Sequence, residues 1–84
     1  MLKVNELLSE LTAQNAIIVK QYIDAYQTDP NPGLIDRFKR EIAETGTMIF
    51  HKSIMEGVDN QLELIKGVQK INLDAACSFM DAIQ

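Results

Sequence analysis

The segment Asp29-Pro30-Asn31-Pro32-Gly33 constrains the fold of this chain most, because it holds both prolines of the sequence. Proline lacks an amide hydrogen and its ring clashes with the preceding helical turn, so this segment ends any helix that reaches it. Apolar residues recur at helical spacing on either side of the segment. The sequence therefore predicts a helical hairpin or a small three- to four-helix bundle, with its main corner at residues 29–33.

The composition is typical of an all-α fold. Hydrophobic residues make up 46% of the 84 residues, with no Trp and few other aromatic side chains. Such a composition favours helix packing over a β-sandwich, which draws on aromatic and β-branched residues. The length allows one domain, so we expect a single helical domain over residues 1–84, without strands. A core this small is often completed by self-association or by a partner protein.

A first helix is predicted over residues from about 5 to 28. One of its faces carries apolar residues at steps of three and four, and Asn15 interrupts this stripe. The apolar members are Val4, Leu8, Leu11, Ile18, Tyr22 and Ala25. Asn15 has two interpretations: a partly exposed edge of the stripe, or a polar group that sets the register of a helix–helix seam.

A second helix is predicted after the corner, with Asn31 as its N-cap and Pro32 at its first position. Its core-facing residues are Ile35, Phe38, Ile42 and Ile49. Gly46 predicts a short break, because glycine commonly ends a helix in the left-handed conformation, and Thr47 would start the next helix. The alternative is one long helix through Gly46, at a cost of about 1 kcal/mol relative to alanine.

The longest run of helical spacing extends from about residue 48 to the end of the chain. Its members are Met55, Val58, Leu62, Ile65, Gln69, Asn72, Ala76, Phe79 and Ile83. The two polar members, Gln69 and Asn72, fall together in the middle, while Val68 and Ile71 shift to a neighbouring face. Two interpretations follow: a bend near residues 71–74, with Asn72 capping a final helix, or an amide pair within the seam.

Motifs for catalysis, metals or nucleotides do not stand out. His51 is the one histidine and has no ligand-spaced companions, Cys77 lies on an apolar face, and the four glycines are isolated. We therefore expect no enzyme activity, no cofactor and no metal site. The net charge of −4 argues against broad binding to a phosphate backbone, so nucleic acid is not the expected partner.

One stretch resembles the helix-turn-helix of small repressors. Ile42-Ala43-Glu44-Thr45-Gly46 followed by Ser53-Ile54-Met55-Glu56 is similar to their Ala-x-x-x-Gly turn and recognition helix, although one residue is missing between Ala43 and Gly46. The resemblance implies a DNA-binding regulator. Its basic residues would have to converge on one surface, and they are Arg37, Lys39, Arg40 and Lys52.

A second resemblance follows the shape of the whole chain. Pro32-Gly33-Leu34-Ile35, followed by Phe38, Ile42, Glu44 and Ser53, is similar to the second-helix pattern of type III secretion needle and inner-rod subunits. Those subunits are helical hairpins turned at a proline-bearing corner. The resemblance implies a subunit of a helical filament, exported without a signal peptide.

The residues themselves favour a non-enzymatic protein–protein interaction module, a small adaptor or regulator that acts through helix faces and associates with itself or with another helical protein. The predicted partner-binding residues are Leu62, Ile65, Phe79, Met80 and Ile83. The last three have an alternative role, packing back on the first helix. The sequence has no apolar run before a cleavage site and no stretch of about eighteen apolar residues, so we expect neither a signal peptide nor a membrane span. We therefore expect a cytoplasmic protein, and one that forms a homo-oligomer.

Overall fold

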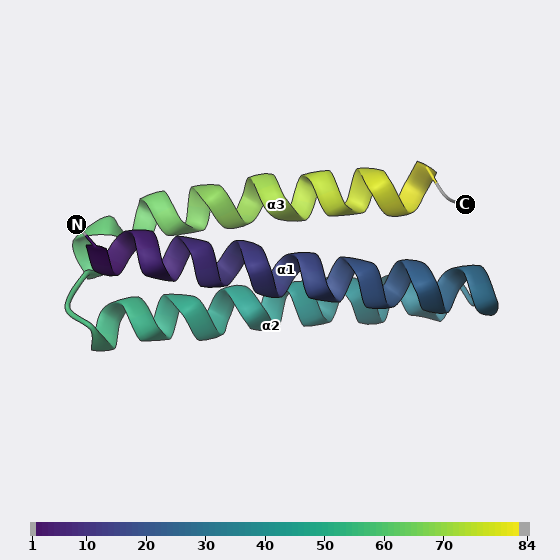
Figure 1. Ribbon diagram of the computed structural model, residues 1–84, viewed down its shortest axis with the longest axis horizontal. Helices are drawn as coiled ribbons and strands as arrows, with labels where there is room; N and C mark the ends of the chain where they lie inside the picture. The colour runs from purple at the N-terminus through teal and green to yellow at the C-terminus, as the bar shows by residue number, and fades with distance from the viewer. Residues whose placement is uncertain (1, 83–84) are drawn as a thin grey trace.

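Three long helices make up the chain in the computed structural model, which describes residues 2–82 (Figure 1). Helix α1 spans Leu2–Thr28, α2 spans Gly33–Met55 and α3 spans Leu62–Ala82, and a short 3-10 turn, η1, spans Asp59–Gln61. Residues 2–82 contain no strand. Each helix runs antiparallel to the next, so α1 and α3 are parallel to each other (Figure 1). The predicted all-α bundle is confirmed.

The first corner lies where the two prolines predict it. Asn31 Oδ1 accepts a hydrogen bond of 2.9 Å from the Gly33 amide, and the Asn31 carbonyl accepts one of 3.0 Å from the Leu34 amide. Pro32 already has helical dihedral angles, φ −57° and ψ −28°. Asn31 therefore satisfies free amides at the start of α2, and the missing amide of Pro32 costs nothing there.

The predicted break at Gly46 is wrong, because α2 continues through it to Met55. The chain turns at Gly57 instead, whose φ of +76° strains any residue with a side chain. The Gly57 amide donates to the Ile54 carbonyl (3.1 Å) and the Val58 amide to the Ser53 carbonyl (2.9 Å). These two bonds form a Schellman cap. The apolar residues keep their 3-4 spacing across this turn, so the spacing alone did not predict a turn at Gly57.

Two apolar clusters fill the interior. The cluster nearer the first corner contains Ile18, Tyr22, Phe38, Ile42, Ala76 and Met80. The cluster nearer the second corner contains Leu7, Leu11, Ile49 and Ile65. In the first cluster the Tyr22 and Phe38 rings meet edge to face, with centroids 5.7 Å apart, and the Tyr22 hydroxyl donates to Glu41 Oε1 at 2.8 Å.

A layer of amides separates the two clusters. Asn15 Nδ2 donates to Gln69 Oε1 at 2.7 Å, and Gln69 Nε2 donates to the Ile42 carbonyl at 2.8 Å. Asn15 is 4% exposed and Gln69 is 7% exposed. The register-setting interpretation of Asn15 therefore holds. Since α3 is continuous from Leu62 to Ala82, the amide pair replaces the bend, and it joins Gln69 to Asn15 rather than to Asn72.

Gly46 is explained by the same layer. A Cβ atom at this position would lie 2.8 Å from Gln69 Nε2 and 3.0 Å from Gln69 Cγ. Separations under about 3 Å force one partner to move, and Gln69 is held by two hydrogen bonds. Glycine is therefore needed inside α2 to make room for the amide, and it does not end the helix.

This packing predicts opposite effects for two glycine substitutions. Gly67→Ala should stabilise the fold by about 0.5–1 kcal/mol, because a Cβ there meets open space and alanine favours the helix. Gly46→Ala makes the same exchange within a helix, but we expect a loss of about 1–3 kcal/mol from overpacking. Urea unfolding of both variants measures the difference. Stabilisation by both substitutions would contradict the account of Gly46.

Candidate interaction surface

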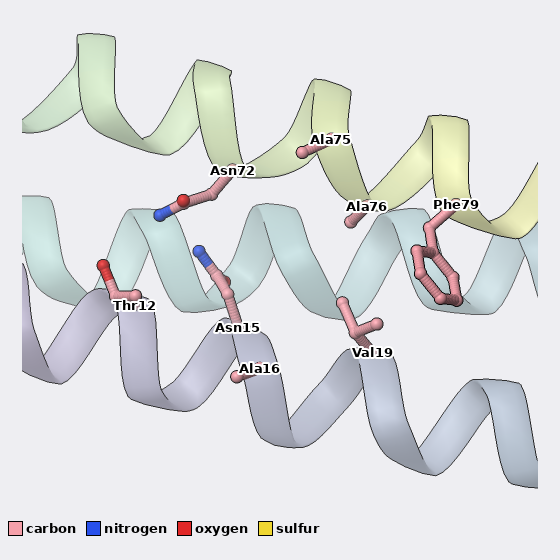
Figure 2. A pocket seen from close by; sticks show the side chains of 8 residues that line it. All are labelled: Thr12, Asn15, Ala16, Val19, Asn72, Ala75, Ala76 and Phe79. Carbon is pink, nitrogen blue, oxygen red and sulfur yellow. The ribbon is translucent and has the colours of Figure 1, made fainter.

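A shallow groove runs between α1 and α3 at the middle of the bundle (Figure 2). Its volume is about 250 Å³, and we call it the α1–α3 groove. The residues that line it are Thr12, Asn15, Ala16, Val19, Asn72, Ala75, Ala76 and Phe79. None of these side chains carries a charge, although 24% of the chain is charged. The lining therefore suits a partner surface that is apolar and uncharged.

On the α3 side, the groove is bordered by an exposed apolar ridge. Leu64, Val68, Ile71, Ala75 and Phe79 follow at steps of three and four, so they share one face of the helix. We call this set the α3 outer stripe. Ile71 is 69% exposed, Phe79 56% and Leu64 49%. These large side chains lie outside the two core clusters.

On the α1 side of the groove, the surface is hollowed and carries mostly small side chains. A second hollow, of about 480 Å³, is lined by Leu8, Ser9, Thr12, Ala13 and Ala16. It shares Thr12 and Ala16 with the α1–α3 groove, so the two hollows are continuous. We call these five residues the α1 furrow. Four of the five have small side chains, which leaves α1 flat beside the ridge on α3.

The predicted partner-binding residues separate into three groups. Ile65 and Met80 are buried, one in each core cluster, so Met80 packs back into the bundle as its alternative role required. Leu62 is half-buried, and Phe79 is exposed beside the groove. Ile83 lies outside the described residues. The sequence interpretation missed Leu64, Ile71 and the α1 furrow, although the shift of Val68 and Ile71 to a neighbouring face was the signal for them.

Two polar atoms lie beneath the groove. Asn15 Oδ1 and Asn72 Nδ2 are buried and have no hydrogen-bond partner within the described chain. Their side chains point toward one another from α1 and α3 (Figure 2). One atom is an acceptor and the other a donor, and no hydrogen bond joins them. The groove thus has an apolar lining above a polar layer, continuous with the bonds of Asn15 to Gln69.

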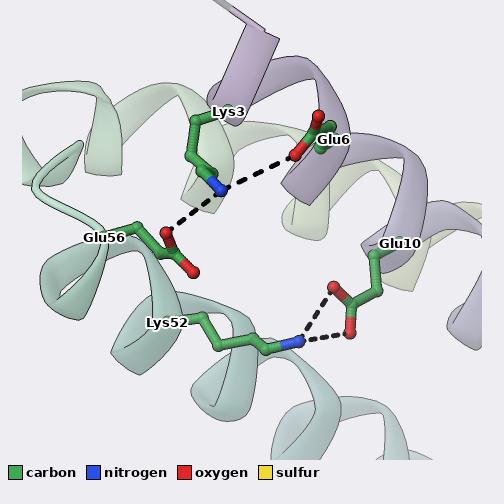
Figure 3. Close-up of polar contacts among 5 residues, drawn as sticks. All are labelled: Lys3, Glu6, Glu10, Lys52 and Glu56. Carbon is green, nitrogen blue, oxygen red and sulfur yellow. Dashed lines mark hydrogen bonds and ion pairs between the residues drawn. The ribbon is translucent and has the colours of Figure 1, made fainter.

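Ion pairs lie on another side of α1, where it meets α2 (Figure 3). Lys3 Nζ lies 3.2 Å from Glu56 Oε2 and 3.8 Å from Glu6 Oε2. Lys52 Nζ donates to both carboxylate oxygens of Glu10, at 2.8 and 3.0 Å. The hydrogen bond that Lys3 donates to Glu56 raises the pKa of Lys3 above its usual value, with support from the charges of Glu56 and Glu6. These charges thus join α1 to α2, and none of them lines the α1–α3 groove or the furrow.

The arrangement expected of a helix-turn-helix is not found in α2. Residues 42–55 form continuous helix across the proposed turn. Arg37 and Arg40 lie near the start of α2, whereas Lys52 lies twelve residues beyond Arg40, about 18 Å along the helix axis. Lys52 is also paired with Glu10. The basic residues therefore do not converge on one surface.

Other kinds of site find little support within residues 2–82. No three side chains among His, Cys, Asp and Glu gather there as a metal site would require. No helix in this part of the chain combines the length and apolar character needed to cross a bilayer. Comparison with models of protein families, with curated proteins and with solved structures finds no match to this chain. The surface geometry is therefore the basis for proposing a function.

The amide layer beneath the groove gives a stability prediction. Gln69→Leu removes the partner of Asn15 Nδ2 and one donor to the Ile42 carbonyl, so we expect a loss of about 1–3 kcal/mol. Adding Asn15→Leu should recover part of this loss, because the orphaned amide is then gone. Gln27→Leu, on the exposed end of α1, is the matched control and should change stability by less than about 0.5 kcal/mol. Thermal unfolding of these three variants and of Asn15→Leu alone measures the coupling, and strictly additive losses would contradict it.

Proposed function

We propose that this protein is a non-enzymatic protein–protein interaction module that associates with itself through its α1–α3 face. The observation that carries the proposal is the α3 outer stripe, in which Ile71, Phe79 and Leu64 are each about half exposed or more. Contiguous exposed apolar surface of this kind commonly marks a protein interface. Burying one large apolar side chain contributes about 1.5–3 kcal/mol, so the stripe supplies a driving force for association.

The low charge of the face supports self-association. Two copies of a chain with a net charge of −4 repel one another at long range, but the α1–α3 groove and the α1 furrow contain no charged residue. Contact within the groove and the furrow therefore brings no like charges together.

The half-buried thiol of Cys77 suits a reducing compartment, so we place the module in the cytoplasm.

A second candidate function is a needle- or rod-like filament subunit. The observation that favours it is the α1–α2 hairpin, which turns at a proline-bearing corner as the resemblance implies. A filament subunit needs a head-to-tail contact that does not close, whereas one face pairing with its own copy gives a closed dimer. The two candidates therefore differ in how mass depends on concentration.

The proposal predicts that one of two matched substitutions prevents association. Ile71→Glu places a charge on the α3 outer stripe and should convert the wild-type dimer to a monomer. Ile54→Glu alters a comparably exposed isoleucine on α2, 54% exposed against 69%, outside both the groove and the furrow, and should leave the dimer intact. Light scattering over a concentration series measures the mass. A monomeric wild-type protein at every concentration would overturn the proposal, and open-ended growth would favour the filament.

A further inference from the structure

We infer that the occupant of the α1–α3 face is a second copy of this chain, related by a two-fold axis parallel to the helices, so that the α3 outer stripe of each copy lies in the α1 furrow of the other. The inference rests on the proposed self-association and specifies its geometry. Its central contact is Ile71 of one copy between Ala13 and Ala16 of the other.

The α1–α3 face has a ridge of large side chains on α3 beside a hollow on α1. The α3 outer stripe carries large side chains, of which Ile71 protrudes most. The α1 furrow beside it is formed by Ser9, Thr12, Ala13 and Ala16, closed at one end by Leu8. Each copy therefore offers a ridge and a hollow side by side. A surface with both is complementary to its own copy, as an isologous interface requires.

The exposed Ile71 and the α1 furrow lie at the same height along the bundle axis. In the groove, Asn15 lies opposite Asn72 and Val19 lies opposite Ala76 (Figure 2). Both pairs differ by 57 in residue number, so a residue of α3 is level with the residue of α1 that is 57 positions earlier. Ile71 is then level with position 14, between Ala13 and Ala16. The most exposed member of the stripe thus lies at the height of the furrow.

Symmetry selects the direction of the axis. A two-fold axis along the bundle keeps every residue at its level and exchanges α1 with α3 across the interface, so each ridge meets a hollow. A two-fold axis across the bundle would instead oppose α3 to α3 and α1 to α1. Ile71 would then lie against its own equivalent, ridge on ridge, because it is close to the middle of α3. The relief therefore favours the lengthwise axis.

The available area agrees with a partner of the same length. The bundle extends 42 × 18 × 16 Å, so a face 42 Å long and 18 Å wide offers about 750 Å². Stable protein interfaces bury about 800 Å² on each partner. Almost the whole face must therefore be covered, which a short peptide does not achieve. A second copy has the required length and brings the same uncharged groove and furrow.

Cross-linking between copies tests the arrangement. In a Cys77→Ser background, one chain carries Ala13→Cys with an affinity tag, and an untagged chain carries Ile71→Cys. The two chains are unfolded in urea, refolded together and treated with a short bismaleimide, and covalent species are separated by denaturing electrophoresis. Only a contact between copies joins a tagged to an untagged chain. The control mixture replaces Ala13→Cys with Ile54→Cys, on α2 and outside both the groove and the furrow.

The lengthwise axis predicts a covalent tagged–untagged dimer from the Ala13 and Ile71 mixture and none from the control mixture. A covalent dimer from the Ile71→Cys chain alone would overturn the inference in favour of the crosswise axis. Absence of both products, in a protein whose mass is that of a dimer by light scattering, would also overturn it while self-association stands. Circular dichroism of each variant confirms that the helices are retained.

Discussion

The structure depends on the two hydrogen bonds of the Gln69 amide, which link all three helices. Gln69 belongs to α3, accepts a bond from Asn15 of α1 and donates one to the Ile42 carbonyl of α2. A buried amide that loses its partners costs free energy, and sliding α3 by one turn, about 5.4 Å, would break both bonds. Apolar contacts alone tolerate such slips more readily, because they lack direction. The amide layer therefore fixes the register, and Gly46 makes room for it.

The register of the interior also determines the outer surface. Because Gln69 is held against Asn15, Asn72 and Ala76 are level with Asn15 and Val19. The α3 outer stripe then runs beside the small residues of α1, with Ile71 at the height of the α1 furrow. A slip of one turn would offset the ridge from the hollow. The buried amides thus position the exposed surface that borders them.

The sequence predicted what local chemistry decides, and failed where the choice depends on a distant side chain. The proline corner at residues 29–33 and most of the core faces of α1 and α2 follow from ring geometry and helical spacing, although Ala25 of the predicted stripe is exposed and Leu7 is buried in its place. Gly46 and Gly57 look alike in the sequence, but Gly46 faces Gln69 across the bundle whereas Gly57 takes a positive φ in open space. On α3, Met80 is buried and its neighbour Phe79 is exposed, because adjacent residues point about 100° apart.

The division of α3 into two apolar stripes has a functional consequence. Ile65, Ala76 and Met80 belong to the core clusters, while Leu64, Ile71 and Phe79 are largely exposed. The buried set packs within the core of one copy, whereas the exposed set contributes apolar surface that is not buried in that core. In the proposed dimer, stability and association would thus draw on different residues of one helix. Substitution of Leu64, Ile71 or Phe79 would therefore alter the proposed association without disturbing the amide layer that holds the bundle in register.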